Sequence, residues 1–458
     1  MKHSGVLWLS CTLGACRPGP DAPPTQAPAA VATATATATA SPTSSAVAAA
    51  PAKPTQLDDD GDDDPSDAGS GEVPERAHFE LVGRAPLSLQ RICDLTPLGD
   101  SLFAAHANAP LGSDGASISR YSPSDGQKPF RVAFDWNRPG EPSQGGGAGQ
   151  GFLRVHRLGA RLFVPDADPP YYGFWLSRTG TEGFVFVSDA EGQFARARMP
   201  GHLPPALPNN EGKPGAALLP NAYHVLDVIR YRGRYYASTG AVPPGKQPNY
   251  PEAPGALYVA DTDLARFQYA VEYPHPRTQT VTRLTFMTRF RDRLYAGIQD
   301  FEGQSPHDFL YFEPARGSSS ITQSDLHAVR ITPEGSAATY RWYTDQGKLY
   351  WIAATRGGVA LRVSDDGDQF RIVELPAEAG VPTDIVRFRD ALVVLCERAL
   401  LRLTDTEAKV VALIDDKRSP FALSDFFCAA PLAVFQNELY AGGQQRGELY
   451  RLVAQHGP

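Results

Sequence analysis

Helical patterns are almost missing from this chain of 458 residues. Stretches with a helical period are scarce, whereas Gly (42) and Pro (41) are abundant and the apolar runs are rich in aromatic and β-branched residues. This combination predicts an all-β fold. The apolar run near the N-terminus covers only residues 6–13, which is too short to span a bilayer as a helix.

The motifs of metal-dependent and nucleophilic catalysis are also lacking. The chain has no HExxH, no CxxC pair and no GxSxG, which are the short signatures of zinc and serine enzymes. The glycine-rich stretch at residues 145–151 is not followed by Lys-Ser or Lys-Thr or by a helix, so it does not predict a phosphate-binding loop. We therefore predict no metal site, and the cofactor, if there is one, is unknown.

The net charge of -8 is concentrated in one acidic stretch, residues 57–72. The rest of the chain is close to neutral, so no basic surface predicts nucleic acid or an anionic membrane as its partner. We expect a monomer.

A repeated pattern extends from Leu102 to Leu439. Each copy has a polar turn, a Leu-Tyr-like pair that begins a strand, a connection, and then a second alternating strand. The pairs are Leu102-Phe103, Leu162-Phe163, Tyr235-Tyr236, Leu294-Tyr295, Leu349-Tyr350, Leu392-Val393 and Leu439-Tyr440. A further strand precedes each hairpin and a fourth often follows it, which predicts a seven-bladed β-propeller of four-stranded antiparallel blades over residues 77–458, with six or eight blades as alternatives.

The last repeat lacks its fourth strand, because the chain ends soon after residues 449–453. An unmatched strand, residues 78–83, lies before the first repeat. We expect it to pair with the blade that holds Leu439 and Tyr440, which would close the propeller and remove an exposed sheet edge.

The N-terminus has the organisation of an export signal. Lys2 supplies a positive charge, residues 6–13 form the apolar core, and Leu13-Gly14-Ala15-Cys16 ends it. This ending resembles the bacterial lipobox, which implies acylation of Cys16 with palmitate or a similar chain and a signal peptide over residues 1–16. Arg17 implies, by the same resemblance, the outer membrane. The alternative is cleavage after Ala15 with Cys16 unmodified.

Residues 17–76 are predicted to form a disordered tether. Ala, Thr, Pro and Ser fill its first part, and a run of aspartates follows. Such a composition cannot bury enough apolar surface to offset the entropy cost of ordering. Alternating aspartates around Gly61 resemble a calcium loop, but no Glu stands at the twelfth position, so a solvated spacer is the stronger interpretation.

Three cysteines, Cys93, Cys396 and Cys428, belong to the predicted propeller. Cys93 begins the inner strand of the first repeat and Cys428 that of the last, which closure of the propeller would make neighbours. A disulfide between them suits an oxidising compartment. Two separate buried thiols are the alternative.

Three tails after second hairpin strands share a pattern: residues 187–194, 259–267 and 363–370. Ser364, Asp366, Gly367 and Phe370 resemble the Asp-box turn of sialidase-like propellers. Such a turn is structural, because the carboxylate caps backbone amides and Gly takes a positive φ. The resemblance is limited to the repeats and implies no sialidase active-site residues.

The connections on one face are long in the first four repeats and short in the last three, so we expect a binding site over the first four. The candidate residues combine His and Asp from inner strands with aromatic and acidic residues from the long connections. They are His156, Asp166, Asp168, Tyr172, Trp175, His224, Asp227 and Asp300, with His307, Tyr171, Phe174 and Tyr250 as further candidates.

Three functions fit these features. The first is a lipoprotein exposed at the bacterial envelope whose propeller binds a glycan or a protein, with no catalytic residue assigned. The second is a sialidase-like or lyase-like enzyme that uses the His and Asp residues in acid-base chemistry or metal binding. The third is a purely structural scaffold. For the histidines themselves, hydrogen bonding between neighbouring blades is the simpler alternative.

Overall fold

The structure is a computed structural model that describes residues 68–86, 91–107, 116–136, 151–167, 183–195, 206–207, 212–240, 253–260, 264, 266–273, 282–300, 305–404, 407–414, 419–424 and 427–455. The chain divides into two units, Met1–Leu57 and Asp58–Pro458, and the described residues belong to the second. Within them the only helices are the short 3-10 turns η2 (Pro123–Asp125), η4 (Gln323–Asp325) and η5 (Ala377–Ala379). None of these is long and apolar enough to cross a membrane. The all-β prediction is confirmed.

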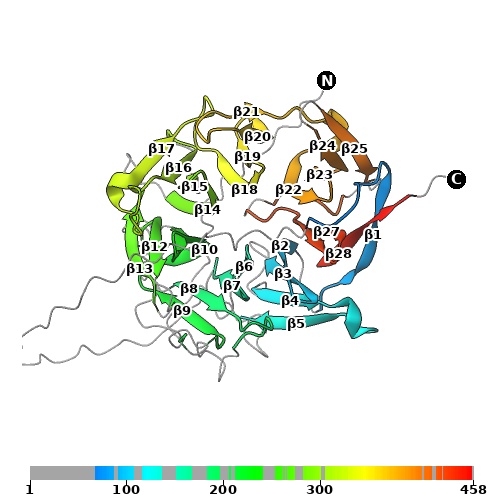
Figure 1. The fold of residues 1–458 in the computed structure, drawn as a ribbon, viewed down its shortest axis with the longest axis horizontal. Coiled ribbons are helices and arrows are strands. Elements are labelled where there is room, and N and C mark those ends of the chain that lie inside the picture. The colour runs from blue at the N-terminus through cyan, green and yellow to red at the C-terminus, as the bar shows by residue number, and fades with distance from the viewer. Residues whose placement is uncertain are drawn as a thin grey trace, which may run out of the picture. The chain divides into compact units, whose positions relative to one another are not determined.

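The strands form four-stranded antiparallel groups, which we number in chain order and which surround a common centre (Figure 1). Group one has β2 (Arg91–Leu98), β3 (Ser101–Ala107), β4 (Ser117–Tyr121) and β5 (Phe130–Asp135). Group two has β6 (His156–Leu158), β7 (Arg161–Pro165), β8 (Gly183–Val187) and β9 (Gly215–Leu219). Group three has β10 (Tyr223–Tyr231), β11 (Arg234–Gly240), β12 (Ala256–Ala260) and β13 (Gln268–Glu272).

Groups four and five belong to one eight-stranded sheet. Group four has β14 (Thr282–Phe290), β15 (Arg293–Asp300), β16 (Phe309–Phe312) and β17 (Leu326–Val329). Group five has β18 (Ala338–Asp345), β19 (Lys348–Thr355), β20 (Gly358–Ser364) and β21 (Arg371–Ile372). A single parallel bridge, Ile298 with Ala338, joins the two groups.

The last two groups return to separate four-stranded sheets. Group six has β22 (Pro382–Phe388), β23 (Ala391–Cys396), β24 (Ala399–Leu403) and β25 (Ala408–Leu413). Group seven has β26 (Leu432–Phe435), β27 (Glu438–Gly442), β28 (Glu448–Ala454) and β1 (Ala77–Arg84).

The core lies between successive groups, because each sheet has two apolar faces. Phe103 of group one, for example, belongs to the same buried cluster as Leu162 and Phe186 of group two. Ile92 and Leu102 of group one are likewise buried in one cluster with Tyr440 of group seven. The first and last groups are therefore packed against each other by apolar contacts.

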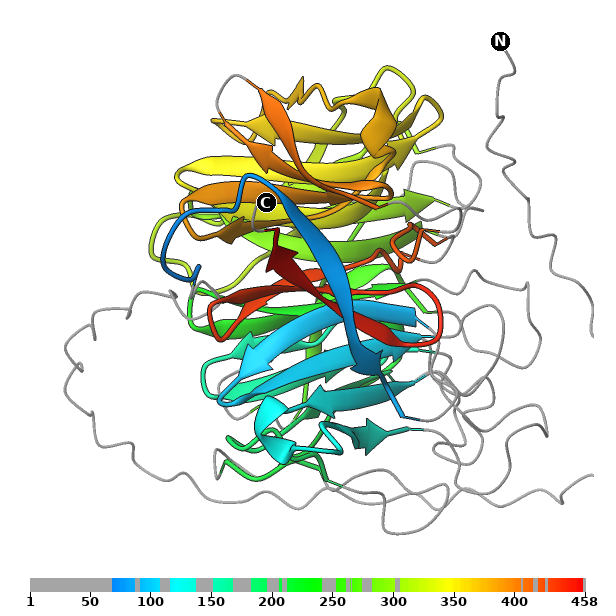
Figure 2. The same ribbon diagram turned by 90° about the vertical axis from the view of Figure 1, so that its right-hand side faces the viewer.

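β1 completes the last group. It pairs antiparallel with β28, from Ala77 opposite Ala454 to Arg84 opposite Glu448, and Figure 2 shows the two strands side by side. This is the pairing predicted for the strand at residues 78–83. β28 thus has a partner on each side, β27 and β1, and does not present an unpaired edge.

Residues 68–76, which the sequence places in the tether, are packed against the folded unit. Val73 is 2% exposed and lies in a cluster with Phe388 and Leu439. Its backbone amide donates to Asp390 Oδ1 at 2.8 Å. Burial of this valine and its hydrogen bond show that the packed part of the chain includes residues before β1.

Cys93 and Cys428 form a disulfide, which links residues 335 positions apart in sequence. Of the two alternatives left open by the sequence, the bonded one is therefore present. Cys396 is a buried free thiol. The bond ties the start of group one to the connection that precedes group seven.

The turn after β20 has the hydrogen bonds expected for the Asp-box pattern. Asp366 Oδ1 accepts from the amides of Asp368 (2.9 Å) and Gln369 (2.8 Å), and these backbone hydrogen bonds lower the pKa of Asp366. Gly367 has φ of +84°, and the Phe370 ring packs on Trp351 with centroids 5.7 Å apart. The turn stabilises the fold locally.

Candidate functional site

His156 and Asp227 are brought together from the inner strands of groups two and three. His156 Nε2 lies 2.5 Å from Asp227 Oδ1. The Asp227 side chain is buried at 2% exposure, whereas that of His156 is 30% exposed. Burial opposes protonation of His156, but the charge of Asp227 and the hydrogen bond outweigh it, so the pKa of His156 is raised. The pair is therefore a partly exposed imidazole held by a buried carboxylate that favours its protonated form.

His224 makes a different contact. Its Nδ1 lies 2.9 Å from the backbone oxygen of Ala167, in the segment after β7. Burial and the positive charge of Arg283 hold the pKa of His224 well below its usual value. Asp166, beside Ala167, is fully buried. Both candidate histidines thus bond to a neighbouring group, as the structural alternative expects.

Asp300 and His307 belong to a second polar cluster in group four. His307 Nδ1 lies 2.8 Å from Tyr273 Oη, which is 3.4 Å from Ser305 Oγ. Asp300 is buried. Burial raises the pKa of Tyr273, and the negative charge of Asp300 adds to this increase. The aromatic and acidic candidates of the long connections, Asp168, Tyr171, Tyr172, Phe174, Trp175 and Tyr250, lie outside the described residues.

One position of the inner strands carries charge in most groups. It stands eight residues before each of the repeated strand pairs. Its occupants, in chain order, are Asp94, Arg154, Asp227, Phe286, Arg341, Asp384 and Pro431. In β2, β10, β14, β18 and β22 the pairing register shifts at or beside this position, as in a β-bulge, which redirects a side chain. We call the five charged members, together with His156, the inner-strand charge cluster.

The three aspartates of the cluster each link their own group to the following one. Asp94 Oδ2 accepts from the amide of Val155 at 3.0 Å. Asp227 Oδ2 accepts from the amide of Met287 at 2.6 Å, and Asp384 Oδ2 from that of Leu432 at 2.7 Å. In each case the donor is the residue directly after the repeated position in the next group. The carboxylates therefore join adjacent inner strands.

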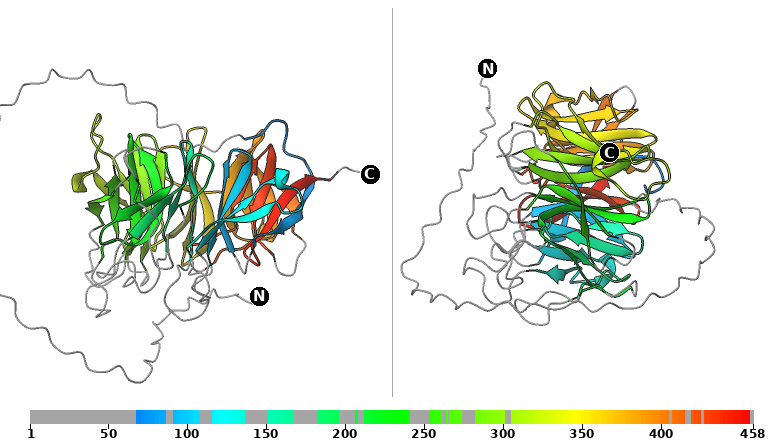
Figure 3. Two further views of the ribbon diagram at one scale, coloured as in Figure 1. Left: turned by 90° about the horizontal axis from the view of Figure 1, so that it is seen from below. Right: turned by 90° about the vertical axis from the view of Figure 1, so that its left-hand side faces the viewer.

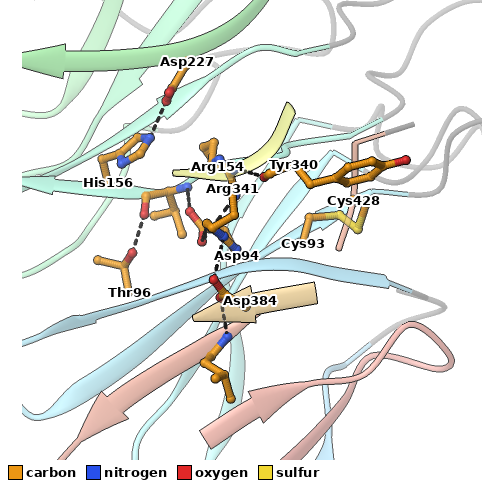
Figure 4. Close-up of polar contacts among 12 residues, drawn as sticks. Cys93, Asp94, Thr96, Arg154, His156, Asp227, Tyr340, Arg341, Asp384 and Cys428 are labelled. Atoms are coloured by element: carbon orange, nitrogen blue, oxygen red, sulfur yellow. Dashed lines mark hydrogen bonds and ion pairs between the residues drawn. A yellow bond between two sulfur atoms is a disulfide. The ribbon is translucent and has the colours of Figure 1, made fainter. Parts of the chain in front are cut away.

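The two arginines contact two of these carboxylates, those of Asp94 and Asp384 (Figure 4). Arg341 lies 2.8 Å from Asp384 and 3.2 Å from Asp94. Arg154 is 3.9 Å from Asp94 and donates to the backbone oxygen of Tyr340 at 2.7 Å. Its guanidinium also stacks 3.7 Å from the centre of the Phe286 ring, a cation–π contact.

The connection before β26 reaches the same region. Phe427 packs on Phe286, with centroids 5.8 Å apart, and on Tyr340, at 6.4 Å. Tyr340 Oη donates to the backbone oxygen of Ser424 at 3.1 Å. The disulfide between Cys428 and Cys93 attaches the same connection to the inner strand of group one.

The cluster is balanced in charge when His156 is protonated, because three carboxylates then face two guanidinium groups and one imidazolium. Burial lowers the pKa of Arg154 to about 10, and the nearby Arg341 contributes. Burial raises the pKa of Asp384 despite its contact with Arg341. Among these groups His156 alone combines exposure with a pKa that starts near neutrality. Acid-base chemistry here would depend on that one side chain.

We predict that replacing His156 with Gln destabilises the protein in a pH-dependent way. Because the pKa of His156 is higher in the folded protein than its reference value of 6.5, the pair adds stability that is fully present below pH 6.5. This stability is lost as the pH rises through the pKa of His156 in the folded protein. At pH 6 we expect the free energy of unfolding of the wild type to exceed that of the variant by about 1.5 kcal/mol, the low end for hydrogen bonds to charged groups. Urea unfolding of both proteins from pH 6 to pH 9 measures it.

The difference in unfolding free energy between the two proteins reports on His156 and not on the other histidines. His106, whose pKa burial lowers to about 4, and His224 also titrate on unfolding, but they do so in both proteins. If the difference in unfolding free energy between wild type and variant stayed constant or grew with pH, the His156–Asp227 contact would not depend on a protonated imidazole.

Metal binding has no support in the described ranges, where no group of three or more His, Cys, Asp or Glu side chains could hold an ion.

The comparisons with known proteins show no family for this chain. No family model matches the chain, and no curated protein matches it. Solved structures that resemble it include a computationally designed protein, Ika8 (10% identity, TM-score 0.43), which covers 82% of this chain and 100% of its own. A catalytically inactive virginiamycin B lyase from Staphylococcus aureus has 10% identity and TM-score 0.46 over 82% of this chain and 100% of its own. The extracellular domain of BT4673 from B. thetaiotaomicron has 8% identity and TM-score 0.47 over 83% of this chain and 40% of its own.

Proposed function

We propose that this protein is a ligand-binding β-propeller lipoprotein of the bacterial envelope. The seven four-stranded groups are its blades, and β1 closes the propeller by pairing with β28. The lipobox-like ending at Cys16 and the composition of residues 17–67 support an acylated N-terminus on a long tether, at the outer membrane. The ligand is a glycan or a protein.

The observation that carries the binding assignment is the unequal length of the connections at one end of the groups. The connections between second and third strands cover residues 108–116, 166–182, 241–255 and 301–308 in groups one to four. In groups five and six they shrink to residues 356–357 and 397–398. Long connections on one half of a repeated scaffold are typical of a binding surface.

An enzyme is the weaker proposal. The aspartates of the inner-strand charge cluster are buried and contact backbone amides together with an arginine or, for Asp227, His156, so they join groups rather than face a substrate. His156 is the one partly exposed titratable member, whereas acid-base catalysis requires two groups at one substrate atom. Tyr273, Ser305 and His307 form a second polar cluster that shares no residue with the inner-strand charge cluster.

We predict that Trp175→Ala abolishes binding, because an aromatic residue of a long connection contributes more to ligand contact than to folding. Glycan-array and pull-down screens of the full-length protein would identify the ligand, and titration calorimetry would measure the loss. Tyr269→Ala, which removes a 49%-exposed aromatic side chain from the outer strand β13, is the matched control and should bind as wild type. Equal binding by both variants would move the site elsewhere.

We predict that Cys16→Ser shifts the protein from the membrane fraction to the soluble fraction, because serine lacks the sulfur to which the lipid anchor would be attached. Fractionation and intact-mass measurement of the N-terminus test this. A variant that stays with the membranes, together with an unacylated wild type, would contradict the lipoprotein proposal without affecting the ligand-binding one.

A further inference from the structure

The turns that join each inner strand to its second strand are rich in arginine. We call these segments, residues 97–101, 157–161, 230–234, 289–293, 344–348, 387–391 and 434–438, the inner turns. Their basic residues are Arg157, Arg161, Arg230, Arg232, Arg234, Arg289, Arg291, Arg293, Lys348, Arg387 and Arg389. Their acidic residues are Asp100, Asp292, Asp345, Asp390 and Glu438. The inner turns therefore carry excess positive charge in a chain whose net charge is -8.

The turns between third and fourth strands carry the opposite excess. In an antiparallel meander these turns lie at the same end of the sheet as the inner turns. Three of them, residues 122–129, 313–325 and 365–370, are described in full, and we call them the outer turns. Their acidic residues are Asp125, Glu313, Asp325, Asp365, Asp366 and Asp368, and their basic residues are Lys128 and Arg316.

Contacts between groups show that these turns gather at one end of the folded unit. Arg232 of the group-three inner turn pairs with Asp292 of the next inner turn at 2.8 Å, and Arg387 of group six pairs with Asp345 of group five at 2.5 Å. The strands of the groups also run in roughly the same direction in Figure 3. Arg293 of the group-four inner turn also pairs with Glu313 and Asp368 of the outer turns, at 3.1 and 2.9 Å. These pairs neutralise part of the charge, but the inner turns contain eleven basic and only five acidic residues, so their net charge stays positive.

The first residues that the structure describes, from Ala68 on, lie at this same end. The amide of Arg389, in an inner turn, donates to the backbone oxygen of Ala68, and its guanidinium donates to the backbone oxygen of Glu72 at 3.0 Å. Ser70 donates its amide to Asn437 Oδ1, in the last inner turn, at 2.5 Å. Gly69 has φ of +76°, and a Cβ there would lie 2.4 Å from Asn437 Oδ1. Residues 68–73 are therefore fixed against two inner turns.

The segment immediately before Ala68 is strongly acidic. Residues 58–67 contain Asp58, Asp59, Asp60, Asp62, Asp63, Asp64 and Asp67. We propose that this segment docks on the arginine-rich inner turns of its own chain. Because it is covalently attached beside them, its effective concentration at this surface is high. Docking holds the start of the tether at the end opposite the long connections and leaves those connections open to a ligand.

An anionic membrane suits this surface less well than a narrow acidic peptide. A flat layer of phosphate headgroups would meet the acidic outer turns together with the basic inner turns, and like charges in contact repel. A single extended chain can lie along the inner turns without contacting the outer turns. Ten extended residues span roughly 33 Å, enough to pass several of these turns.

The test measures competition between the tether and an added peptide of the same sequence. A fluorescein-labelled peptide of residues 57–67 is titrated by fluorescence anisotropy into full-length wild type and into a neutral-tether variant with the seven aspartates changed to Asn. We expect the variant to bind it at least about tenfold more tightly, because the tether of the wild type competes at high local concentration. Binding should vanish at 1 M salt, where the Debye length is about 3 Å.

Matched charge changes locate the surface. In the neutral-tether background, Arg157→Gln with Arg291→Gln should weaken peptide binding about fivefold, as expected for the loss of two exposed charge contacts. Lys128→Gln with Arg316→Gln, which removes the same charge from exposed residues of the outer turns, should not. Equal peptide binding by wild type and neutral-tether variant, or equal effects of the two charge pairs, would overturn the proposal. So would binding of the variant to phosphatidylglycerol vesicles but not to the peptide.

Discussion

A chain that begins at Ala85, and so lacks β1 and residues 68–76, is expected to aggregate and to lose its cooperative unfolding transition. Its β28 would have an unpaired edge able to pair with other molecules. It would also lose the burial of Val73 and Ala77 and the contact of Phe79 with Phe421, whose centroids are 5.0 Å apart. We expect a cost of more than about 5 kcal/mol, comparable with the whole stability of many domains.

The matched control is a chain that begins at Ala68, which keeps β1 and its preceding contacts. It should stay soluble and keep a cooperative unfolding transition, since it retains β1 and the contacts of residues 68–76. Size-exclusion chromatography and urea unfolding compare the two truncated chains. A soluble, monomeric chain from Ala85 with an unchanged unfolding midpoint would show that β1 is dispensable for the fold.

Arg341→Met is the second change with a large expected effect. Methionine keeps much of the aliphatic length of arginine but removes the charge between Asp94 and Asp384, whose side chains are 10% and 5% exposed. Removing one partner from a buried ion pair leaves uncompensated charge and costs about 3–5 kcal/mol. Urea unfolding measures the loss.

Arg402→Met is the matched surface control. Arg402 pairs with Asp390, and both side chains are 34% exposed, so its loss should cost less than about 1 kcal/mol. Adding Asp384→Asn to Arg341→Met should restore part of the stability, because it removes one of the two stranded carboxylates. If both arginine variants lost the same small amount, the inner-strand charge cluster would not stabilise the centre.

Sequence patterns revealed some of the residues of the candidate site and missed others. The sequence pointed to His156 and Asp227 as inner-strand residues, and the structure joins them. It did not point to Asp94, Arg154 and Arg341, although each stands eight residues before a repeated strand pair. Aligning the repeats on those pairs would have revealed the charged position. No alignment, however, predicts which carboxylate contacts which guanidinium.

The sequence by itself determined the all-β class, the repeated four-stranded units and the pairing of the strand at residues 78–83 with the last unit. These depend on local alternation of apolar residues, turn residues and an unmatched strand, all of which are readable along the chain. Only the tertiary structure decided that Cys93 and Cys428 are bonded and that residues 68–76 are packed. It also decided that the central aspartates and arginines neutralise one another. Such contacts join groups far apart in sequence, and their distances follow from packing around the centre rather than from any local pattern.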